Sequence, residues 1–526
     1  MRWWWLLAIA VVSVPLLWPL PTTSRWDIVE DTALAAGKAA YLDSLLAAPR
    51  TAAPNVLLLL ADDLGKFDVS AYGGPPGSTP SIDALAQRGV RFDAAYTTAP
   101  ICAPSRAALL TGRYQNRFGF ESQPMQRYVR NRGEYLGFRY IVDTDAMRPF
   151  LLDAYPDAAQ RTQQGLPASE VSLAEVFAAR GYATGIIGKW HLGYAPHNHP
   201  HAFGFQFQYG FMEAFTLYAD ESDPQVVNHH HPLFWEEHIW DMQRGGPSAI
   251  TRQGATVAEP RYLTDALVAE TKLFIDGALQ QDRPFFAYVP FSAPHTPFQA
   301  RRADFEAIEG ARDHNQQVYL AMIRRLDWAV GELLAHLEAR GVAGDTIVVF
   351  TSDNGGAAYT GATDNGPLRG GKFTQFGGGL QVPLLVRWDR EAPRRVRRPV
   401  LLTDLFATLL NVLGVAAPQD RAYDSQDLLA ESADRQRPLF WRSDFNRAVL
   451  QDQWKLLHDT RDDTVLLFDG RADPGERRNL AAEHPERVQA LRGLLDDWER
   501  DLQAPRWPRV MNYRYEDALG THWFAI

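Results

Sequence analysis

The sequence predicts an α/β protein with a mainly parallel sheet, because short apolar runs alternate with helix-like stretches along the chain. Each run is short and continuous, which is typical of a strand buried on both faces of a parallel sheet. The stretches between the runs carry apolar residues at helical spacing, and two of them stop at Gly89 and Gly181. This alternation predicts strand–helix–strand units.

The predicted elements follow one another between residues 55 and 413. We expect strands at residues 55–61, 183–188, 284–291 and 345–351. We expect helices at residues 81–88, 173–180, 262–279, 316–340 and 401–413.

The pattern changes toward the C-terminus. Segments 448–457 and 465–469 alternate between apolar and polar residues, which indicates a small antiparallel sheet, and a charged helix is expected over 482–502. The last residues are rich in Trp, Tyr and Pro and show no clear periodicity. The expected organisation is an N-terminal segment at 1–22, a catalytic domain at 53–430, a C-terminal subdomain at 437–503 and a tail at 504–526.

Length and charge narrow the classes of function. The 526 residues are enough for one large core with a smaller appendage. The formal net charge of −10 argues against a nucleic-acid-binding protein, for which a basic surface is typical. An anionic substrate must therefore be attracted by local cations, since the chain as a whole repels it.

The N-terminus resembles an export segment. Arg2 precedes an apolar run from Trp3 to Leu20, which is interrupted only by Ser13 and two prolines. The run is near the lower limit for crossing a bilayer, and no clean small-x-small cleavage site follows it. We expect an exported protein, whether periplasmic, extracellular or held by an uncleaved N-terminal membrane anchor.

Polar side chains follow each of the four predicted strands. They are Asp62 and Asp63, then Lys189 and His191, then His295, and finally Asp353 and Asn354. In open α/β sheets, ligands bind beyond the carboxyl ends of the strands. We therefore expect these side chains to converge on one site.

Four of these residues offer only oxygen ligands: Asp62, Asp63, Asp353 and Asn354. Hard cations such as calcium or magnesium prefer oxygen, whereas zinc prefers nitrogen and sulfur. Two adjacent acids at one strand end and an Asp-Asn pair at another favour a metal site over isolated helix caps or turns. Chemistry alone leaves calcium and magnesium open.

Cys102 is the only cysteine, so the chain forms no internal disulfide. The segment around it reads as a turn that enters a helix, and Pro104 suits the first helical turn. Cys102 is therefore expected at or just before a helix N-terminus, where backbone N–H groups favour anions. The residues alone leave an inert thiol and a thiolate nucleophile as alternatives.

Several motifs together carry a family resemblance. Cys102-Ala-Pro-Ser-Arg106 resembles the C-x-P-S-R signature of type I, formylglycine-dependent sulfatases, which belong to the alkaline-phosphatase-like superfamily. The other matching segments are Asp62-Asp63, Gly188-Lys-Trp-His-Leu-Gly193, Pro294-His-Thr-Pro-Phe298, Ser352-Asp-Asn-Gly355, Arg369-Gly-Gly-Lys372, Leu467-Phe-Asp469 and Asp473-Pro-Gly-Glu476. The resemblance covers about residues 54–502, and it implies the family's mainly parallel sheet with helices and a small C-terminal antiparallel sheet.

The resemblance implies a covalent mechanism. A maturation enzyme would convert Cys102 into formylglycine, whose hydrate attacks the sulfur of a sulfate ester and expels the alcohol. Loss of a proton from the second hydroxyl then eliminates sulfate and restores the aldehyde.

The resemblance also implies roles for the side chains. One calcium ion per chain would be held by Asp62, Asp63, Asp353, Asn354 and the group derived from Cys102. Arg106 would steady the hydrate, and Lys189 and Lys372 would bind the sulfate. His191 would take the proton from the hydrate, and His295 would protonate the leaving oxygen.

One segment departs from the family pattern. Many relatives carry Glu-Gly-Gly shortly after the second lysine, whereas this chain has Phe376-Gly377-Gly378-Gly379. A more flexible loop or an altered local charge is expected there.

Three further segments have open interpretations. The insertion 121–165, rich in Arg and aromatic residues, either grips an anionic sugar or packs on the core as a surface excursion. His229-His230-His231 is interpreted as a polar loop, with a metal site as the alternative. The basic stretch 394–398 is interpreted as solvated surface, with polyanion binding as the alternative.

The leading hypothesis is a sulfatase that acts on a sulfated carbohydrate or an aryl sulfate. The nearest alternative is a phosphonate monoester hydrolase or phosphodiesterase, because related enzymes share the nucleophile and the metal arrangement. An inactive protein that binds sulfated glycans is an alternative from another class, and it predicts an unmodified Cys102.

Overall fold

The computed structural model describes residues 15–49, 54–430 and 437–526. Its centre is a mixed sheet with the strand order β13-β2-β12-β11-β1-β9-β4-β5-β7-β8. The middle strands run parallel, namely β11 (Thr346–Ser352), β1 (Asn55–Ala61), β9 (Phe285–Pro290), β4 (Ala183–Lys189) and β5 (Phe207–Phe211). The predicted α/β class is confirmed, and the four predicted strands lie side by side.

Strands on both margins were not predicted. Next to β11 lie β12 (Gln381–Arg387) and β2 (Val90–Tyr96), which pair in antiparallel fashion. The short outer strands are β13 (Arg394–Val396), β14 (Val400–Leu401), β7 (Thr251–Arg252) and β8 (Ala255–Thr256). β2 lacks a continuous apolar run, because Arg91 and Asp93 alternate with its buried residues.

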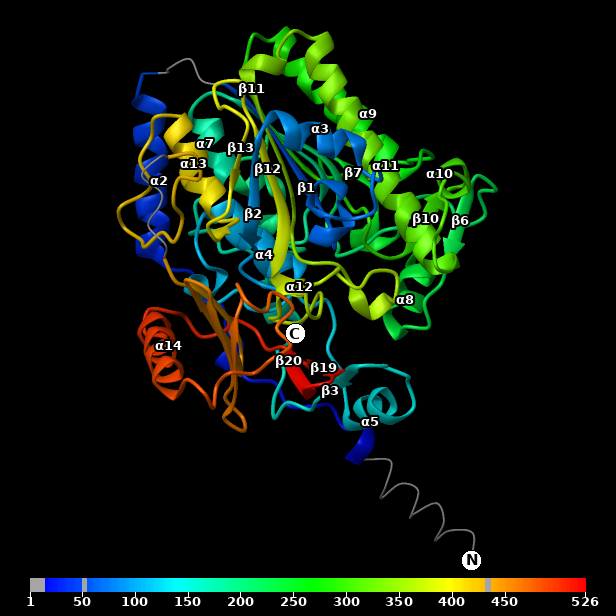
Figure 1. The fold of residues 1–526 in the computed structure, drawn as a ribbon, viewed down its shortest axis with the longest axis vertical. Helices are drawn as coiled ribbons and strands as arrows, with labels where there is room; N and C mark the ends of the chain where they lie inside the picture. The colour runs from blue at the N-terminus through cyan, green and yellow to red at the C-terminus, as the bar shows by residue number, and fades with distance from the viewer. Residues whose placement is uncertain (1–14, 50–53, 431–436) are drawn as a thin grey trace, which may run out of the picture.

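Helices cover both faces of the sheet (Figure 1). Alternate residues of β1 point to opposite faces, and each set packs into a different hydrophobic core. Leu57 and Leu59 belong to the same core as α3, α9 and α11, whereas Val56, Leu58 and Leu60 belong to the core of the opposite face. The helices of the first face are α3 (Pro80–Arg88), α9 (Leu263–Gln280) and α11 (His314–Ala339). Those of the second are α2 (Thr32–Ala47), α4 (Cys102–Thr111), α7 (Leu173–Ala179) and α13 (Asp404–Val412).

A separate antiparallel sheet follows near the C-terminus. Its strands are β15 (Leu439–Ser443), β16 (Asn446–Gln451), β17 (Trp454–Asp459) and β18 (Thr464–Asp469), and the helix α14 (Pro485–Glu499) packs against it (Figure 1). The alternating segment 448–457 is two strands rather than one. The chain reverses at Asp452, whose φ of 55° lies in the left-handed region.

The segment 504–526 forms a hairpin, although its sequence shows no clear periodicity. β19 (Met511–Asp517) and β20 (Gly520–Ala525) pair with each other, and β19 also pairs with β3 (Met147–Pro149). The inserted region 121–165 therefore lies next to the last strands of the chain.

The shorter elements surround these layers. They are α5 (Arg132–Tyr140), α6 (Ala158–Thr162), β6 (Val226–His229), α8 (Phe234–Met242), β10 (Phe298–Arg301), α10 (Arg302–Glu306) and α12 (Gly377–Leu380). Most of the N-terminal apolar run lies outside the described residues. Within the described ranges, no helix combines the length and apolar character needed to cross a bilayer.

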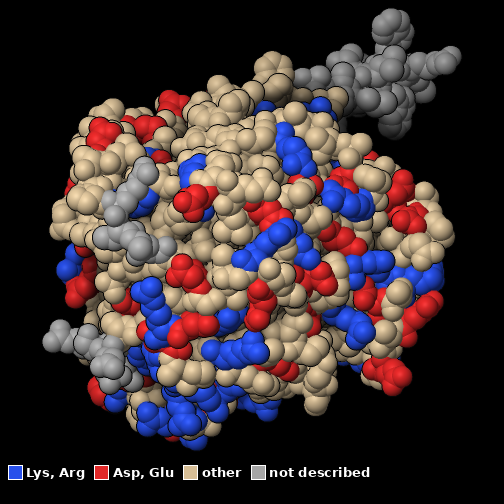
Figure 2. Space-filling model, turned by 90° about the horizontal axis from the view of Figure 1, so that it is seen from above, with Lys and Arg blue, Asp and Glu red and all other residues tan. Residues whose placement is uncertain are grey.

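The face seen in Figure 2 carries basic and acidic side chains interspersed over most of its area, with basic side chains gathered along its lower edge. Within the basic stretch 394–398, Arg394 pairs with Glu391 at 2.5 Å and Arg395 pairs with Asp93 at 2.9 Å. These pairs support the interpretation of a solvated surface.

Candidate active site

Side chains from separate segments meet at the carboxyl ends of the parallel strands. Asp62 and Asp63 follow β1, His191 follows β4, His295 follows β9, and Asp353 and Asn354 follow β11. Lys189 ends β4, Cys102 begins α4 and Lys372 lies on a later loop. All of these side chains and Arg106 are at most 7% exposed. The structure therefore gathers every predicted site residue in one buried group.

Four ion pairs between acidic and basic side chains connect this group. Lys189 Nζ lies 2.6 Å from Asp62 Oδ2, and Lys372 Nζ lies 2.8 Å from Asp63 Oδ2. Arg106 Nη2 lies 2.8 Å from Asp353 Oδ2 and 3.5 Å from Asp62 Oδ2. Three carboxylates thus face three permanent cations, and the buried charge is balanced. A buried charge without a partner would be strongly unfavourable.

The donor atoms fit a hard cation. Ligand atoms of Asp62, Asp63, Cys102 and His295 lie within 4.8 Å of one another. The side-chain oxygen of Asn354 is buried without a hydrogen-bond partner, so it is free to coordinate an ion. A mainly oxygen set suits calcium or magnesium. The geometric group includes His295 but not Asp353, whose carboxylate lies 2.8 Å from Arg106.

Helix α4 holds Cys102 against the metal-site carboxylates. Cys102 is the first residue of the helix, and its Sγ lies 3.5 Å from Asp62 Oδ1 and 3.9 Å from Asp63 Oδ1. The same helix reaches other strand ends, because Ser105 Oγ donates to the carbonyl of Asp353 and Arg106 donates to that of Lys189. Burial raises the pKa of the Cys102 thiol well above its usual value, which disfavours a plain thiolate nucleophile.

The electrostatics of Asp63, Lys372 and His295 are coupled. Burial opposes ionisation of Asp63, but the charge of Lys372 outweighs it and lowers the carboxyl pKa. Burial also opposes the charge on Lys372, and Asp63 outweighs it and raises the ammonium pKa. For His295, burial and then Lys372 lower the pKa well below its usual value. Both carboxylate and ammonium are therefore charged, and the histidine is neutral.

The hydrogen bonds of His295 fix its tautomer. Nδ1 lies 2.6 Å from the carbonyl oxygen of Thr296, which can only accept, so Nδ1 carries the hydrogen. Nε2 lies 3.1 Å from Lys372 Nζ and accepts from it. The hydroxyl of Tyr218 donates to the backbone carbonyl of His295 at 2.9 Å, which helps to fix the backbone at this residue.

His191 is buried and strained. Neither ring nitrogen has a hydrogen-bond partner, and burial followed by the charge of Lys189 lowers its pKa well below the usual value. Its φ is 60°, and that of Asp63 is 61°, so both residues take the left-handed conformation that few side chains favour. Strained backbone of this kind is concentrated at functional sites. An unpartnered neutral imidazole is able to accept a proton from a bound group.

The loop that carries Lys372 is held by the C-terminal part of the chain. Arg369 forms two hydrogen bonds with Asp517 of β19, at 2.6 and 2.9 Å. Its guanidinium carbon lies 3.8 Å from the ring centre of Phe376, and Nη1 donates to the carbonyl of Glu476 at 3.1 Å. Gln375 donates to the carbonyl of Asn446 at 3.2 Å.

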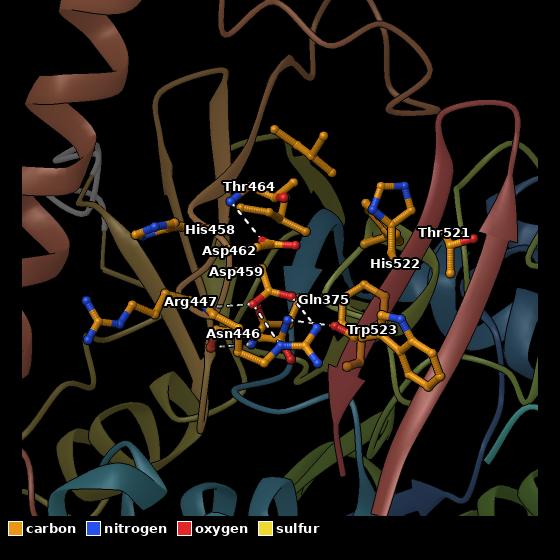
Figure 3. Close-up of a pocket in the computed structure, with 15 residues that line it drawn as sticks. Gln375, Asn446, Arg447, His458, Asp459, Asp462, Thr464, Thr521, His522 and Trp523 are labelled. Carbon is orange, nitrogen blue, oxygen red and sulfur yellow. Dashed lines mark hydrogen bonds and ion pairs between the residues drawn. The ribbon is translucent and has the colours of Figure 1, made fainter. Parts of the chain in front are cut away.

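Asn446 connects three parts of the fold (Figure 3). Besides its contact with Gln375, its side chain donates to the carbonyl of Trp523 at 2.9 Å and accepts from the N–H of Ala525 at 2.7 Å. The pocket in Figure 3 lies between β16–β18 and the final hairpin, so it is separate from Cys102 and its neighbours. This pocket lies where the sheet β15–β18 and the hairpin β19–β20 contact the loop that carries Lys372.

The glycine run 377–379 is packed against this loop. A Cβ atom on Gly378 would lie 2.4 Å from the carbonyl oxygen of Gly370, and one on Gly379 would lie 2.1 Å from that of Thr374. Glu476 brings a carboxylate to the same place, because its Oε2 accepts from the N–H of Gly377 at 2.6 Å. The other oxygen of Glu476 pairs with buried Lys455 at 2.6 Å.

Sequence reasoning missed several supporting residues. Asn365 accepts from the N–H of Gly356 at 2.8 Å and donates to the carbonyls of Gly356 and Gly370, which joins the Asp353 turn to the lysine loop. Glu476 lies in a motif that the sequence analysis quoted but gave no role. Asp517 lies in a segment without periodicity, so no local pattern could identify it.

The histidine segment 229–231 is part of the packing. His230 stacks on Trp240 with ring centres 3.9 Å apart, and His231 contacts Glu236 at 3.3 Å and Asn315 at 3.1 Å. In the described part of the chain, these histidines do not belong to the converging set of ligand atoms. These contacts agree with the interpretation of a polar loop.

The sequence and fold are similar to those of known proteins. A sequence model of the family described as Sulfatase matches residues 54–415. The N-acetylgalactosamine-6-sulfatase of the dog is 34% identical over 416 residues, which cover 76% of this chain and 71% of the relative. Bovine arylsulfatase A is 32% identical over 88% of this chain and 89% of its own length.

A solved structure adds the likeness in three dimensions. The protein Ps i-CgsB, solved in complex with a neocarrahexaose, superposes with a TM-score of 0.72 at 28% identity. The alignment covers 87% of this chain and 95% of that structure.

We predict that Glu476→Ala destabilises the protein by about 3–5 kcal/mol, because it leaves the Lys455 ammonium buried without an acidic partner. Urea unfolding measures the change. Glu483→Ala is the matched control, since Glu483 pairs with Arg478 on the surface, where both side chains are more than half exposed; it should cost less than about 1 kcal/mol. Equal losses in the two variants would contradict the assigned role of Glu476.

We predict a pH-dependent contribution from Asp68, whose carboxylate accepts hydrogen bonds from Tyr319 at 2.7 Å and Thr363 at 2.9 Å. Burial raises its pKa from 3.8 to about 6. The folded state therefore binds this proton more tightly, and the stability it confers is lost as the pH rises from 4 through 6. Asp68→Asn removes this dependence.

The measurement compares the free energy of unfolding of wild type and Asp68→Asn at pH 4 and pH 7. The variant should gain about 2 kcal/mol relative to wild type over this interval, given roughly 1.4 kcal/mol per unit of pKa shift. A difference that is the same at both pH values would show that Asp68 is ionised throughout.

Proposed function

The chain belongs to the sulfatase family of sulfuric ester hydrolases, and on that premise we propose that it removes sulfate from a sulfated carbohydrate. The proposed nucleophile is formylglycine made from Cys102 by a maturation enzyme, and the proposed cofactor is one calcium ion. The observation that carries the proposal is the buried group in which Cys102 lies among three carboxylates, three permanent cations and two histidines.

The carbohydrate part of the proposal rests on relatives. The canine relative is named for N-acetylgalactosamine 6-sulfate, and the solved neighbour was obtained with a carbohydrate bound. An aryl sulfate would fit the same reacting group, because the residues around Cys102 would contact only the sulfate end of a substrate.

The charges of the site support an anionic substrate. Without a metal, the three carboxylates and three cations balance. Asp62, Asp63, Asp353 and Asn354 would hold the calcium ion, which would supply positive charge next to a sulfate oxygen. The site would then carry a surplus of positive charge inside a protein whose net charge is −10. Lys189 and Lys372 are positioned to bind the sulfate and to stabilise negative charge that develops on it.

Formylglycine would supply, as its hydrate, the oxygen that attacks sulfur. Arg106 lies one helical turn after Cys102, and its Nε donates to Asp353 Oδ2 at 2.8 Å. This hydrogen bond holds the guanidinium where it can orient the modified side chain. His191 is neutral and without a partner, which suits it to take a proton from that group. His295 would pass a proton through Nε2 to the leaving oxygen, because Nδ1 is committed to Thr296; Nε2 would receive that proton from the ammonium group of Lys372, 3.1 Å away, which would be left neutral.

We also propose that the chain is exported, with residues 1–22 as a cleaved signal or a membrane anchor. The support is the apolar run of Trp3–Leu20 behind Arg2. An oxidising compartment is compatible with a chain that has one cysteine and forms no internal disulfide.

The primary test combines mass analysis of the Cys102 peptide from the native host with assays of paired sulfate and phosphate esters. We expect the aldehyde mass at residue 102, sulfate release from sulfated sugars and loss of activity on removal of the metal. An intact thiol in fully active protein would overturn the mechanism. Faster hydrolysis of phosphonate or phosphate diesters would favour the alternative hydrolase, and sugar binding without sulfate release would favour an inactive binding protein.

A second prediction separates the two histidines. Loss of the proton donor matters only when the leaving group is a poor one, so His295→Ala should slow hydrolysis of a sugar sulfate by about 10²–10⁴-fold. Hydrolysis of nitrophenyl sulfate, which releases an acidic phenol, should fall far less. His191→Ala is the control, because its role does not depend on the leaving group and both substrates should slow alike. Equal losses for both substrates in His295→Ala would rule out the assigned proton transfer.

A further inference from the structure

Exposed apolar side chains gather beside the N-terminal segment. In the described ranges, the large hydrophobic residues that are exposed include six that we define as the apolar patch: Leu17, Trp18, Leu136, Tyr140, Ile141 and Val142. Trp18 is 69% exposed, Tyr140 75% and Ile141 85%. A group of this kind on a soluble surface marks an interaction site.

The two parts of the apolar patch are joined through the backbone. The N–H of Leu20 donates to the carbonyl of Arg130 at 2.9 Å, and Pro19 forms an antiparallel bridge with Asn131. A Cβ atom on Gly133 would lie 3.3 Å from the carbonyl oxygen of Leu16. Figure 1 shows α5 beside the first described residues, at the end of the molecule far from α9.

Helix α5 presents its apolar residues on one side. Leu136 and Tyr140 are four residues apart and therefore lie on the same face, and Ile141 and Val142 extend the surface beyond the helix. Asn131 caps the helix by accepting from the N–H of Glu134 at 2.8 Å, so the exposed face belongs to a well-formed helix.

Cationic and aromatic side chains surround these apolar residues. Residues 127–142 contain four arginines and one glutamate, in a chain whose net charge is −10. The side chains of Arg127 and Arg130 are 67% and 76% exposed. Arginine at the margin with Trp and Tyr between is typical of protein surfaces at the boundary between water and lipid.

We propose that the apolar patch rests on a lipid bilayer with anionic headgroups; this rests on the proposed function in its anchor alternative, in which residues 1–22 stay attached. The sequence favours lipid over other partners, because the apolar run that begins at Trp3 extends, interrupted only by Ser13 and Pro15, to Leu17 and Trp18. A bilayer that receives this run also reaches α5, since residues 19 and 20 are bonded to residues 130 and 131. The rest of the catalytic domain then stands on the membrane in a fixed orientation.

The test uses the full-length protein in vesicles of phosphatidylcholine and phosphatidylglycerol. Ile141→Cys provides a site for an environment-sensitive fluorophore, because native Cys102 is buried. Leu273→Cys on α9 is the matched control, since Leu273 is an exposed leucine, 61% accessible, at the far end of the molecule. Lipids brominated on their acyl chains should quench the label at residue 141 at least threefold more than the label at 273.

A second variant removes the apolar contact without touching the active site. With the label on Leu136→Cys, adding Ile141→Asp and Val142→Asp should reduce the quenching by bromolipids at least threefold, while hydrolysis of a soluble aryl sulfate stays unchanged. Equal quenching at residues 141 and 273 would overturn the proposal. So would a label at 141 that is shielded before lipid is added, which would indicate a second copy or residues 1–14 as the occupant.

Discussion

The structure depends on a balance of buried charge at the carboxyl edge of one parallel sheet. Asp62, Asp63 and Asp353 are removed from water, and each is stable there only because Lys189, Lys372 or Arg106 lies beside it. The six groups come from β1, β4, β11, α4 and a later loop. Each buried charge is stable only if its partner of opposite charge lies within hydrogen-bonding distance. The ion pairs therefore fix the relative positions of the elements that carry them.

Five of these six charges sit on regular elements or directly behind them, but Lys372 does not. Its loop is fixed from outside by Arg369, which Asp517 and the ring of Phe376 hold, and by Glu476, which binds Gly377. Glu476 of the C-terminal subdomain brings a carboxylate to the glycine run. The loop that carries Lys372 is therefore held by residues outside the group around Cys102.

The parallel strands and the polar residues behind them could be predicted because burial on both faces leaves a continuous apolar run, and chemistry follows where the run stops. The same rule missed β2, in which Arg91 and Asp93 interrupt the pattern, and β19, whose pairing partner β3 lies far earlier in the chain. Asp517 and Asn365 escaped for a related reason. Both residues act through hydrogen bonds to residues distant in the sequence, and no pattern in the neighbouring sequence indicates these bonds.

The final hairpin has a consequence for the order in which the protein is made. Synthesis runs from the N-terminus, so Cys102, the proposed metal ligands and both histidines leave the ribosome long before Asp517. A nascent chain can close its central sheet and still lack the strand that steadies Lys372. The enzyme would then become active only after its last residues are translated. A chain truncated before Asp517 would form the central sheet but lack the contact that orders the loop of Lys372.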